Sequence, residues 1–206
     1  MENYDLIMQE EIKNIDASGG KRPSLLLHAC CAVCSSYVIA CLHSCFELTV
    51  LYYNPNIEPM VEYEKRKNEQ LRLLKEYPQV KIMDIDYENE SFRKIAEGLE
   101  NEPEGGARCS KCIELRLSRT AELARDSNFD YFCSTLSVSP HKNAVLINSL
   151  GRKLQDEKKV KWLFSDFKKR DGFLKSNTES KRLGLYRQDY CGCIFSKQKS
   201  GEGGKA

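Results

Sequence analysis

The stretch SLLLHACCAVC, residues 24–34, decides the fold, because an apolar run passes directly into a cysteine-rich turn. The run from Ser24 to His28 predicts a short buried strand, and residues 35–45 beyond the cysteines have helical character. Strand, loop and helix in this order form the first unit of a parallel α/β sheet. Ligands of such sheets bind beyond the carboxyl ends of the strands, so these cysteines stand where chemistry is expected.

The alternation of strands and helices continues along the chain. Further strands are predicted at 48–53, 80–85, 131–136 and 160–164, and further helices at 1–15, 58–77, 90–99, 109–124, 140–154 and 172–183. We therefore expect an α/β fold, a single domain with a Rossmann-like parallel sheet over residues 21–196 and a cysteine-bearing C-terminal segment. A helical extension over 1–20 is expected before it, and residues 197–206, rich in Gly, Lys and Ser, predict a disordered tail.

Composition narrows the class of protein. With 206 residues, of which 41% are hydrophobic and 30% charged, the chain can bury the core of one domain. Its apolar runs are far shorter than the roughly 20 residues of a membrane span, and residues 1–16 lack the pattern of a secretory signal. We therefore expect no membrane segment and a cytoplasmic location. The net charge of +2 neither demands nor excludes a nucleic-acid partner.

Cysteine usage points to metal or redox chemistry. The chain has ten cysteines, and without a secretory context a disulfide framework is not the expected use of them. Seven fall into three compact groups, which are Cys30-Cys31 with Cys34, Cys109-x-x-Cys112, and Cys191-Gly192-Cys193. The other three, Cys41, Cys45 and Cys133, have no partner at ligand spacing and are predicted to be core residues.

The first two groups have the spacing of metal ligands. Cys109 and Cys112 stand at a helix start, where both thiolates can face one centre and helix amides lower their pKa. Adjacent Cys30 and Cys31 must be turned toward one cluster or toward neighbouring centres, and Cys34 offers a further thiolate unless it is a buried helix cysteine. Thiolate sulfur suits zinc or iron–sulfur clusters, and half of a structural zinc site is the alternative interpretation.

The third group has a different geometry. A single glycine between Cys191 and Cys193 permits a small-ring disulfide that opens and closes during turnover. We therefore favour a redox pair at this position. The alternative is a zinc half-site that closes the tail onto the domain.

Several motifs in a fixed order support a family assignment. They are HACCAVC at 28–34, YNPNI at 53–57, GARC at 106–109 with Cys112 and Arg116, LSVSPHK at 136–142, DFKK at 166–169, YRQ at 186–188 and YCGC at 190–193. On these motifs the sequence resembles the QueH-type epoxyqueuosine reductase family across nearly all of residues 24–196. The expected sheet also resembles that of the adenine nucleotide alpha-hydrolase superfamily, which includes the PP-loop tRNA-thiolating enzymes.

The family resemblance implies a specific set of cofactors and a reaction. It implies a 4Fe-4S cluster held by Cys30, Cys31, Cys109 and Cys112, and a redox-active dithiol formed by Cys191 and Cys193. A second iron beside the cluster is also implied as a family feature, with Cys34 as its best ligand, and spacing does not assign each first-loop cysteine to one centre. The implied reaction is the two-electron, two-proton conversion of epoxyqueuosine in tRNA to queuosine, with release of water. It is the last step of queuosine biosynthesis, and it needs an external electron donor and no cobalamin.

Other polar residues were weighed for roles at the same site. His141 and Lys142 precede a predicted helix, where they could donate protons or bind phosphate. We expect His28 to be a hydrogen-bonded structural residue and His43 to lie at the surface. A further set could contact RNA or simply pack and pair locally, and it comprises Arg108, Arg116, Arg187, Tyr53, Tyr186 and the basic runs 168–170 and 181–182.

Two other functions fit parts of the pattern. A PP-loop-like tRNA-thiolating enzyme would need a Ser-Gly-Gly-x-Asp-Ser type phosphate loop after the first strand, whereas residues 29–34 read ACCAVC. A zinc-stabilised RNA-binding module would bind a colourless metal and show no redox activity. An anaerobic visible spectrum therefore distinguishes these alternatives from an iron–sulfur enzyme.

Overall fold

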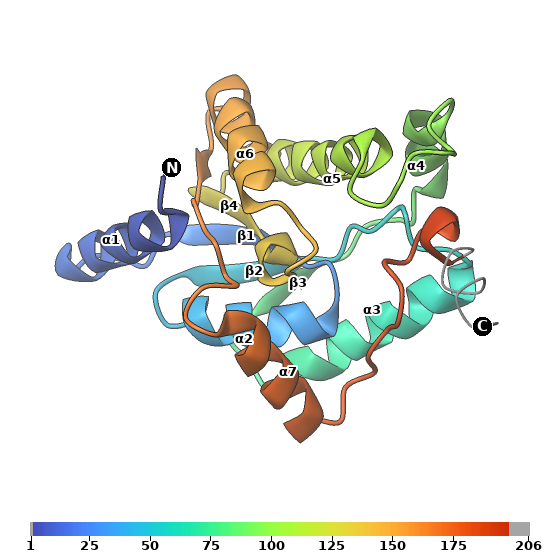
Figure 1. Cartoon of the computed structure of the whole chain (residues 1–206). Helices are drawn as coiled ribbons and strands as arrows, with labels where there is room; N and C mark the ends of the chain where they lie inside the picture. The colour runs from blue at the N-terminus through green and yellow to red at the C-terminus, as the bar shows by residue number, and fades with distance from the viewer. Residues whose placement is uncertain (1, 198–206) are drawn as a thin grey trace.

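Strand β1 lies at the centre of a five-stranded sheet in the computed structural model, which describes residues 2–197 (Figure 1). The strands are β1 (Ser24–His28), β2 (Glu47–Leu51), β3 (Lys81–Met83), β4 (Tyr131–Ser134) and β5 (Lys161–Trp162). Their order across the sheet is β3-β2-β1-β4-β5, and all neighbouring pairs are parallel. This confirms the predicted parallel α/β fold, and the order is that of a Rossmann-like sheet.

Helices cover both faces of this sheet. They are α1 (Tyr4–Ala17), α2 (Ala32–Leu42), α3 (Met60–Leu74), α4 (Asn89–Ala96), α5 (Ala107–Asp126), α6 (Ala144–Lys158) and α7 (Gly172–Arg182). Figure 1 shows α5 and α6 above the sheet and α2, α3 and α7 below it. Connections of this kind are required between parallel strands, because a tight hairpin cannot join them.

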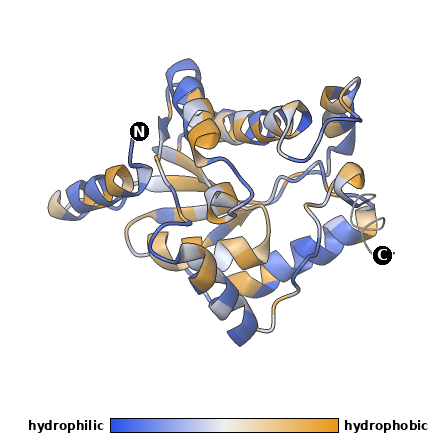
Figure 2. Cartoon of the chain, in the orientation of Figure 1, coloured by the Kyte–Doolittle hydropathy of each residue, from blue (hydrophilic) through white to orange (hydrophobic). Residues whose placement is uncertain are grey.

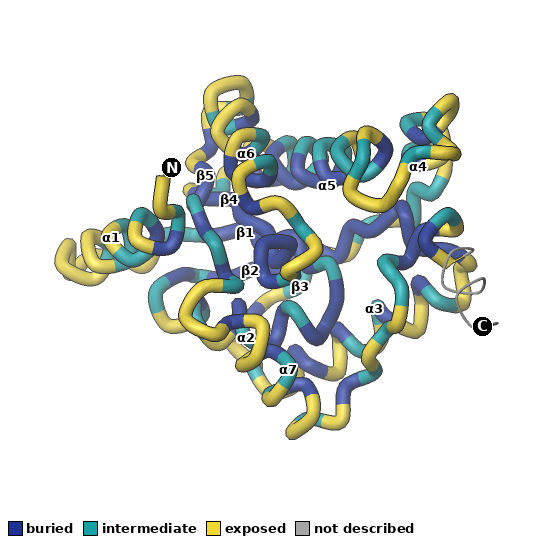
Figure 3. The backbone as a smooth tube through the Cα atoms, viewed as in Figure 1, coloured by how far each residue is buried: buried dark blue, intermediate teal, exposed yellow. Residues whose placement is uncertain are grey.

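The side chains of β1 explain why this strand is central. Leu25 and Leu27 belong to the apolar cluster on the α2 and α3 face, whereas Leu26 belongs to the cluster on the α5 and α6 face. All three are fully buried, as the continuous apolar run of a strand covered on both faces requires. The central strands β1, β2 and β4 are accordingly hydrophobic in Figure 2 and buried in Figure 3, while the outer faces of the helices are polar and exposed.

The N-terminal helix α1 packs on the same core as the sheet. Met8 is buried in the apolar cluster of the α2 face. Asp5 forms a salt bridge with Arg170 at 3.2 Å. No helix in the described part of the chain is long and apolar enough to cross a membrane. The predicted tail begins at Lys197, which lies in a helical turn together with residues 194–196, and residues 198–206 lie outside the described residues.

Two boundaries near the site differ from the prediction. The strand expected to reach residue 136 stops at Ser134, because the Ser134 hydroxyl accepts a hydrogen bond from the Leu136 N–H and starts a 3-10 turn. The helix predicted from residue 140 begins at Ala144. Asn143 caps it by accepting hydrogen bonds from the N–H groups of residues 145 and 146 at 2.9 and 3.2 Å. His141 and Lys142 are therefore loop residues.

Candidate active site

His28 joins three segments at the carboxyl end of the sheet. Its Nδ1 lies 2.8 Å from the Ser134 hydroxyl, and its Nε2 donates to the Tyr53 carbonyl at 2.9 Å. Burial, with a contribution from the charge of Arg116, lowers the pKa of His28 to about 3. The ring is therefore neutral and serves the hydrogen-bonded structural role that we expected.

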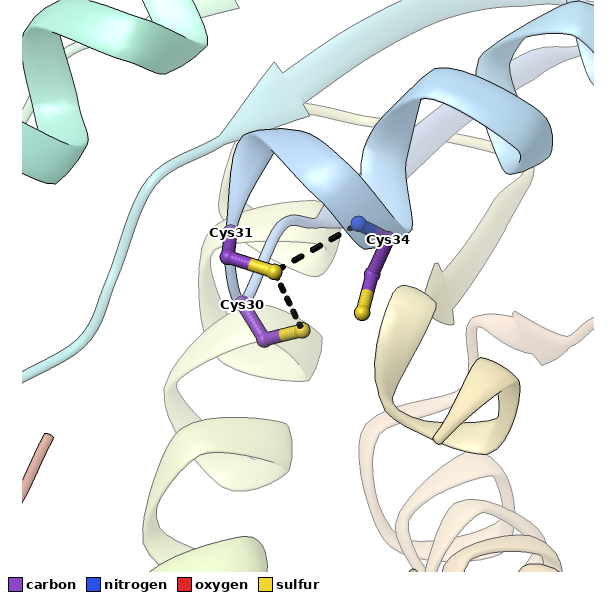
Figure 4. Close-up of side chains that lie close together, drawn as sticks. All are labelled: Cys30, Cys31 and Cys34. Carbon is purple, nitrogen blue, oxygen red and sulfur yellow. Dashed lines mark hydrogen bonds between the residues drawn. The ribbon is translucent and has the colours of Figure 1, made fainter. Parts of the chain in front are cut away.

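Cys30, Cys31 and Cys34 converge where β1 passes into α2. Their three sulfur atoms lie within 4.8 Å of one another, and the Sγ atoms of Cys30 and Cys31 are 4.0 Å apart (Figure 4). Cys31 occupies the N-cap of α2, and its sulfur accepts a hydrogen bond from the Cys34 N–H at 3.4 Å. The Thr135 hydroxyl donates to the Cys30 sulfur at 3.2 Å. The cysteines are thus held by the helix end and by the turn after β4.

This arrangement favours a thiolate at Cys31. Hydrogen bonds from the Cys30 and Cys34 thiols and from the Cys34 N–H hold the pKa of Cys31 well below its usual value, against the effect of burial. Within residues 2–197 these three cysteines are the only group of three or more Cys, His, Asp or Glu ligand atoms close enough to hold one metal ion. Sulfur at this spacing suits a thiophilic metal.

Cys109 and Cys112 lie in the first turns of α5, as their spacing predicted. The Gly105 N–H donates to the Cys109 sulfur at 3.2 Å. Cys112 is buried beside Phe92 and Cys193, and this burial raises the pKa of the Cys112 thiol. The pair stays outside the 4.8 Å group formed by the first three cysteines.

The C-terminal cysteine segment is anchored on α3 by the buried Arg66. The Arg66 guanidinium donates to the carbonyl groups of Cys191 and Tyr190 at 3.3 and 3.4 Å. The Glu58 N–H also donates to the Gly192 carbonyl at 2.8 Å. Gly192 has φ 118°, a conformation open to glycine and strained for other residues. These contacts bring a segment from the end of the chain beside the other cysteines.

Lys142 lies against the first cysteine of that segment. Its Nζ donates to the Cys191 sulfur at 3.5 Å. Burial opposes the charge of Lys142, but the neighbouring Cys191, Cys109 and Glu104 together outweigh it and raise the lysine pKa. Cys193 is buried, and this raises its pKa to about 11. The two thiols of the segment therefore have different surroundings, one beside a cation and one in an apolar wall.

All three cysteine groups line two adjoining cavities. The larger, of about 540 Å³, is lined by Cys30, Cys31, Cys34 and Cys191 among others. The smaller is lined by both cysteines of the α5 pair and both of the C-terminal segment. Four residues, Asn56, Arg116, Lys142 and Cys191, line both cavities. These four residues form a wall shared by the two cavities, which we call the polar partition. The cysteine groups therefore lie around this partition.

Arg116 carries positive charge within this partition. It is only 3% exposed, and its Nε donates to the Cys112 carbonyl at 3.2 Å. Burial lowers the pKa of Arg116, but the thiols of Cys112, Cys191 and Cys30 around it more than compensate and raise it. A buried guanidinium stabilises thiolates, and any anionic centre, that forms beside it.

Several residues weighed for RNA contact have other roles. Arg108 and Arg116 are both buried, so neither belongs to an exposed basic surface. Tyr53 is buried in the core on the α5 face, and Tyr186 packs under Lys65 of α3, with 3.5 Å between the Lys65 nitrogen and the ring centroid. Arg187 is exposed and lines the large cavity.

Asn56 and Arg66 are site residues to which sequence reasoning gave no role. Asn56 is 1% exposed and its Oδ1 has no hydrogen-bond partner within the described chain. It stands in the YNPNI motif, which was a signal for the family but not for a function. Arg66 lies in a charged helix sequence that is typical of a solvated surface, so nothing local indicated its burial.

Fold and site together define a class: a Rossmann-like α/β protein whose cavity beyond the strand ends is lined by grouped cysteines. Comparison with known proteins narrows the class. The family model described as epoxyqueuosine reductase QueH matches residues 25–199. The chain therefore belongs to the epoxyqueuosine reductase QueH family, as the sequence resemblance indicated.

Individual relatives agree with this assignment. The chain is 40% identical to an epoxyqueuosine reductase QueH of Staphylococcus epidermidis, over 97% of this chain and 86% of that protein. It is 39% identical to one of Streptococcus pyogenes serotype M1, over 97% of this chain and 80% of the relative. A third, from Thermotoga maritima, is 34% identical over 84% of this chain and 90% of its own length.

Proposed function

We propose that this chain is an oxidoreductase that converts epoxyqueuosine in tRNA to queuosine at the cysteine-lined cavity. The observation that carries the proposal is the convergence of three cysteine groups on two adjoining cavities at the carboxyl ends of the strands. A cavity of about 540 Å³ falls within the range of small-molecule sites. It can therefore admit a modified nucleoside next to several thiols.

The residues present fit an iron–sulfur cofactor. We propose that Cys30, Cys31, Cys109 and Cys112 hold a 4Fe-4S cluster and that Cys34 is available to an adjacent iron. Support comes from the 4.8 Å grouping of the first-loop sulfurs and from the shared partition between the two cavities. When bound, such centres supply single electrons and a Lewis acid.

The chain itself can supply an electron pair through Cys191 and Cys193. In the proposed step both thiols are oxidised to a disulfide, which releases two electrons and two protons. The substrate epoxide accepts them, both carbon–oxygen bonds to the oxygen break, an alkene forms and the oxygen leaves as water. An external reductant then returns the disulfide to two thiols. The balance of the step needs no other co-reactant.

Lys142 and His141 are the proposed proton donors. The raised pKa of Lys142 keeps the amine charged, next to Cys191, in the wall of the large cavity. From this position it can stabilise a Cys191 thiolate and pass a proton to a leaving oxygen. His141 is exposed and lines the same cavity, where it can exchange protons with solvent.

The proposed partners follow from the reaction. The modified nucleoside is presented by tRNA, and an electron donor reduces the protein between turnovers. We place the reaction in the cytoplasm, where thiols of the kind that line this site are kept reduced.

Anaerobic turnover tests the proposal. The iron- and sulfide-loaded protein is mixed with tRNA carrying epoxyqueuosine and a chemical reductant, without cobalamin, and the digested nucleosides are analysed by mass spectrometry. We expect loss of one oxygen atom from the modified nucleoside over many turnovers. An unchanged nucleoside, or conversion that starts only when cobalamin is added, would contradict the proposal.

A further inference from the structure

Helix α7 places an aromatic side chain at the large cavity. Gly172 begins the helix, and a Cβ at this position would lie 1.7 Å from the Phe167 carbonyl oxygen and 2.6 Å from the Tyr37 ring. Only glycine allows so close an approach, so the start of α7 is fixed against the preceding turn and α2. The next residue, Phe173, lines the cavity and is 37% exposed.

The ring of Phe173 has no aromatic partner. Among residues 2–197 it takes part in none of the aromatic pairs and lies under none of the cations that contact an aromatic ring. Its neighbour Leu174 is more exposed, at 63%, but does not line the cavity. An aromatic face held in place at a cavity and left without a partner is available to a ligand.

An unused carboxamide lies one helical turn further along. Asn177 also lines the cavity, and residues four apart on a helix share one face. The Asn177 Oδ1 atom is buried without a hydrogen-bond partner in the described structure. Because a buried polar group without a partner costs free energy, it gains from a ligand that offers one once the side chain turns toward the cavity. Phe173 and Asn177 together offer a stacking surface and a hydrogen-bonding group.

The charge of this region matches a polyanion. Residues 168–182, which comprise α7 and the turn before it, contain six basic and two acidic residues. Arg170 and Arg182 pair with acidic groups, whereas Lys169 and Lys175 are exposed and form no salt bridge within residues 2–197. Cations of this kind contact phosphates without reading sequence.

We propose that Phe173 stacks on the base of the nucleoside that enters the cavity and that Asn177 hydrogen bonds the edge of that base. Lys169 and Lys175 then contact the adjacent phosphates. The inference rests on the proposed function and names the RNA contact of the same site. An aromatic face and an amide at a cavity, with exposed cations on the same segment, are the usual elements of recognition of an unpaired RNA base.

Binding of an anticodon stem-loop RNA tests the inference without electron transfer. The probe is a fluorescently labelled stem-loop with guanosine at the position that is modified, and a second RNA has an abasic residue there. Phe173→Leu keeps an apolar side chain and removes the ring, Phe173→Tyr restores a ring, and Leu174→Ala is the matched control. The Kd of each protein variant for each of the two RNAs is measured by fluorescence anisotropy. Thermal unfolding confirms that each variant is folded.

Stacking sets the expected size of the effect. Phe173→Leu should raise the Kd for the guanosine RNA about five- to tenfold, whereas Phe173→Tyr and Leu174→Ala should bind like the unsubstituted protein. The unsubstituted protein should bind the abasic RNA more weakly than the guanosine RNA. Phe173→Leu should bind the abasic RNA with the same Kd as the unsubstituted protein does. Asn177→Leu should raise the Kd about threefold.

The possible results distinguish failure of the tRNA substrate from failure of the stacking contact. If the unsubstituted protein does not bind the guanosine RNA, the tRNA substrate and this inference both fall. If it binds well but Phe173→Leu binds equally well, or loses the same factor on the abasic RNA, only the stacking contact is overturned and the proposed reaction stands.

Discussion

Two cavities of similar size lie at opposite edges of the sheet. The cavity at the carboxyl ends of the strands measures about 540 Å³, and the cavity at the amino ends measures about 580 Å³. The first contains cysteines from two of the three groups, whereas no cysteine lines the second. Volume therefore does not identify the site in this fold. The site is identified by its position at the carboxyl ends of the strands and by the residues in its wall.

The polar groups of the two cavities also behave differently. At the amino end, Arg22 donates to the carbonyls of His43 and Ser44, and Gln79 hydrogen bonds the His43 ring at 2.9 Å. At the carboxyl end, Asn56 and Asn177 each have a buried oxygen without a partner in the described structure. The amino-end groups stabilise the protein, while the carboxyl-end groups are available to a ligand.

The largest effect is expected at Cys31. Cys31→Ser removes a thiolate from the centre of the first group, so bound iron should fall to background and turnover by more than about 100-fold. Iron and sulfide analysis after anaerobic reconstitution measures the first effect. Cys45→Ser, at a half-buried cysteine outside both cavities, is the control and should keep its iron. Full iron retention in Cys31→Ser would remove this residue from the ligand set.

The C-terminal pair should separate metal binding from electron supply. Cys191→Ser and Cys193→Ser are expected to retain iron and sulfide and to lose sustained turnover with a thiol reductant, because the disulfide cannot form. Steady-state product analysis beside iron analysis checks both expectations. Normal multiple turnover in both variants would contradict the dithiol role, and loss of iron would make the pair metal ligands.

Substitution of Lys142 should lower turnover less than substitution of the thiols but more than substitution of other lysines. Lys142→Met removes the cation 3.5 Å from the Cys191 sulfur, and general acids typically contribute at least about 100-fold to a rate. We expect a fall in kcat of this order with iron content unchanged. Lys153→Met on α6, which breaks an exposed salt bridge with Glu114 of α5, is the control. Equal kcat values for the two variants would exclude Lys142 from proton transfer.

Gly192 tests how tightly the C-terminal segment is held. In Gly192→Ala the new Cβ would combine a φ of 118° with a contact of 2.9 Å to the Ile57 side chain, a cost of about 1–3 kcal/mol in unfolding free energy. Gly184→Ala is the matched variant, since Gly184 also has positive φ but no atom within 4 Å of its Cβ position. Urea unfolding should show the larger loss for Gly192→Ala, and equal losses would contradict the close packing.

The smallest effect is expected at the amino-end cavity. Gln79→Ala removes the hydrogen bond to His43 and should cost about 1 kcal/mol or less of stability. Its kcat and KM for tRNA should equal those of the unsubstituted protein. A clear change in either constant would mean that the comparison between the cavities is wrong.

The sequence predicted the scaffold of the site because the relevant signals are local. The apolar run of β1 identified a strand buried on both faces, and the CxxC at Cys109 and Cys112 correctly indicated the start of a helix. Parallel strands then bring the turns after β1 and β4 together. This topology is why Thr135, some hundred residues along the chain, donates to the Cys30 sulfur.

Details that depend on distant contacts were not predictable. Arg66 is 2% exposed only because the C-terminal segment returns to α3, where the arginine meets the carbonyls of residues 190 and 191. The start of α6 is an exception, because the Asn143 cap that moves it from residue 140 to Ala144 is a local feature. His43, expected at the surface, is half-buried, and its ring hydrogen bonds Gln79 and lies 5.3 Å from the Tyr77 ring.

The central claim is that electrons from the Cys191 and Cys193 thiols reduce the epoxide in this cavity, and single-turnover stoichiometry tests it most directly. Reconstituted protein is reduced, freed of reductant under anaerobic conditions, and mixed with tRNA carrying epoxyqueuosine. Product nucleoside and disulfide-linked peptide are then quantified by mass spectrometry. The account predicts one queuosine formed for each Cys191–Cys193 disulfide that appears. Queuosine formed while both thiols remain free would contradict it.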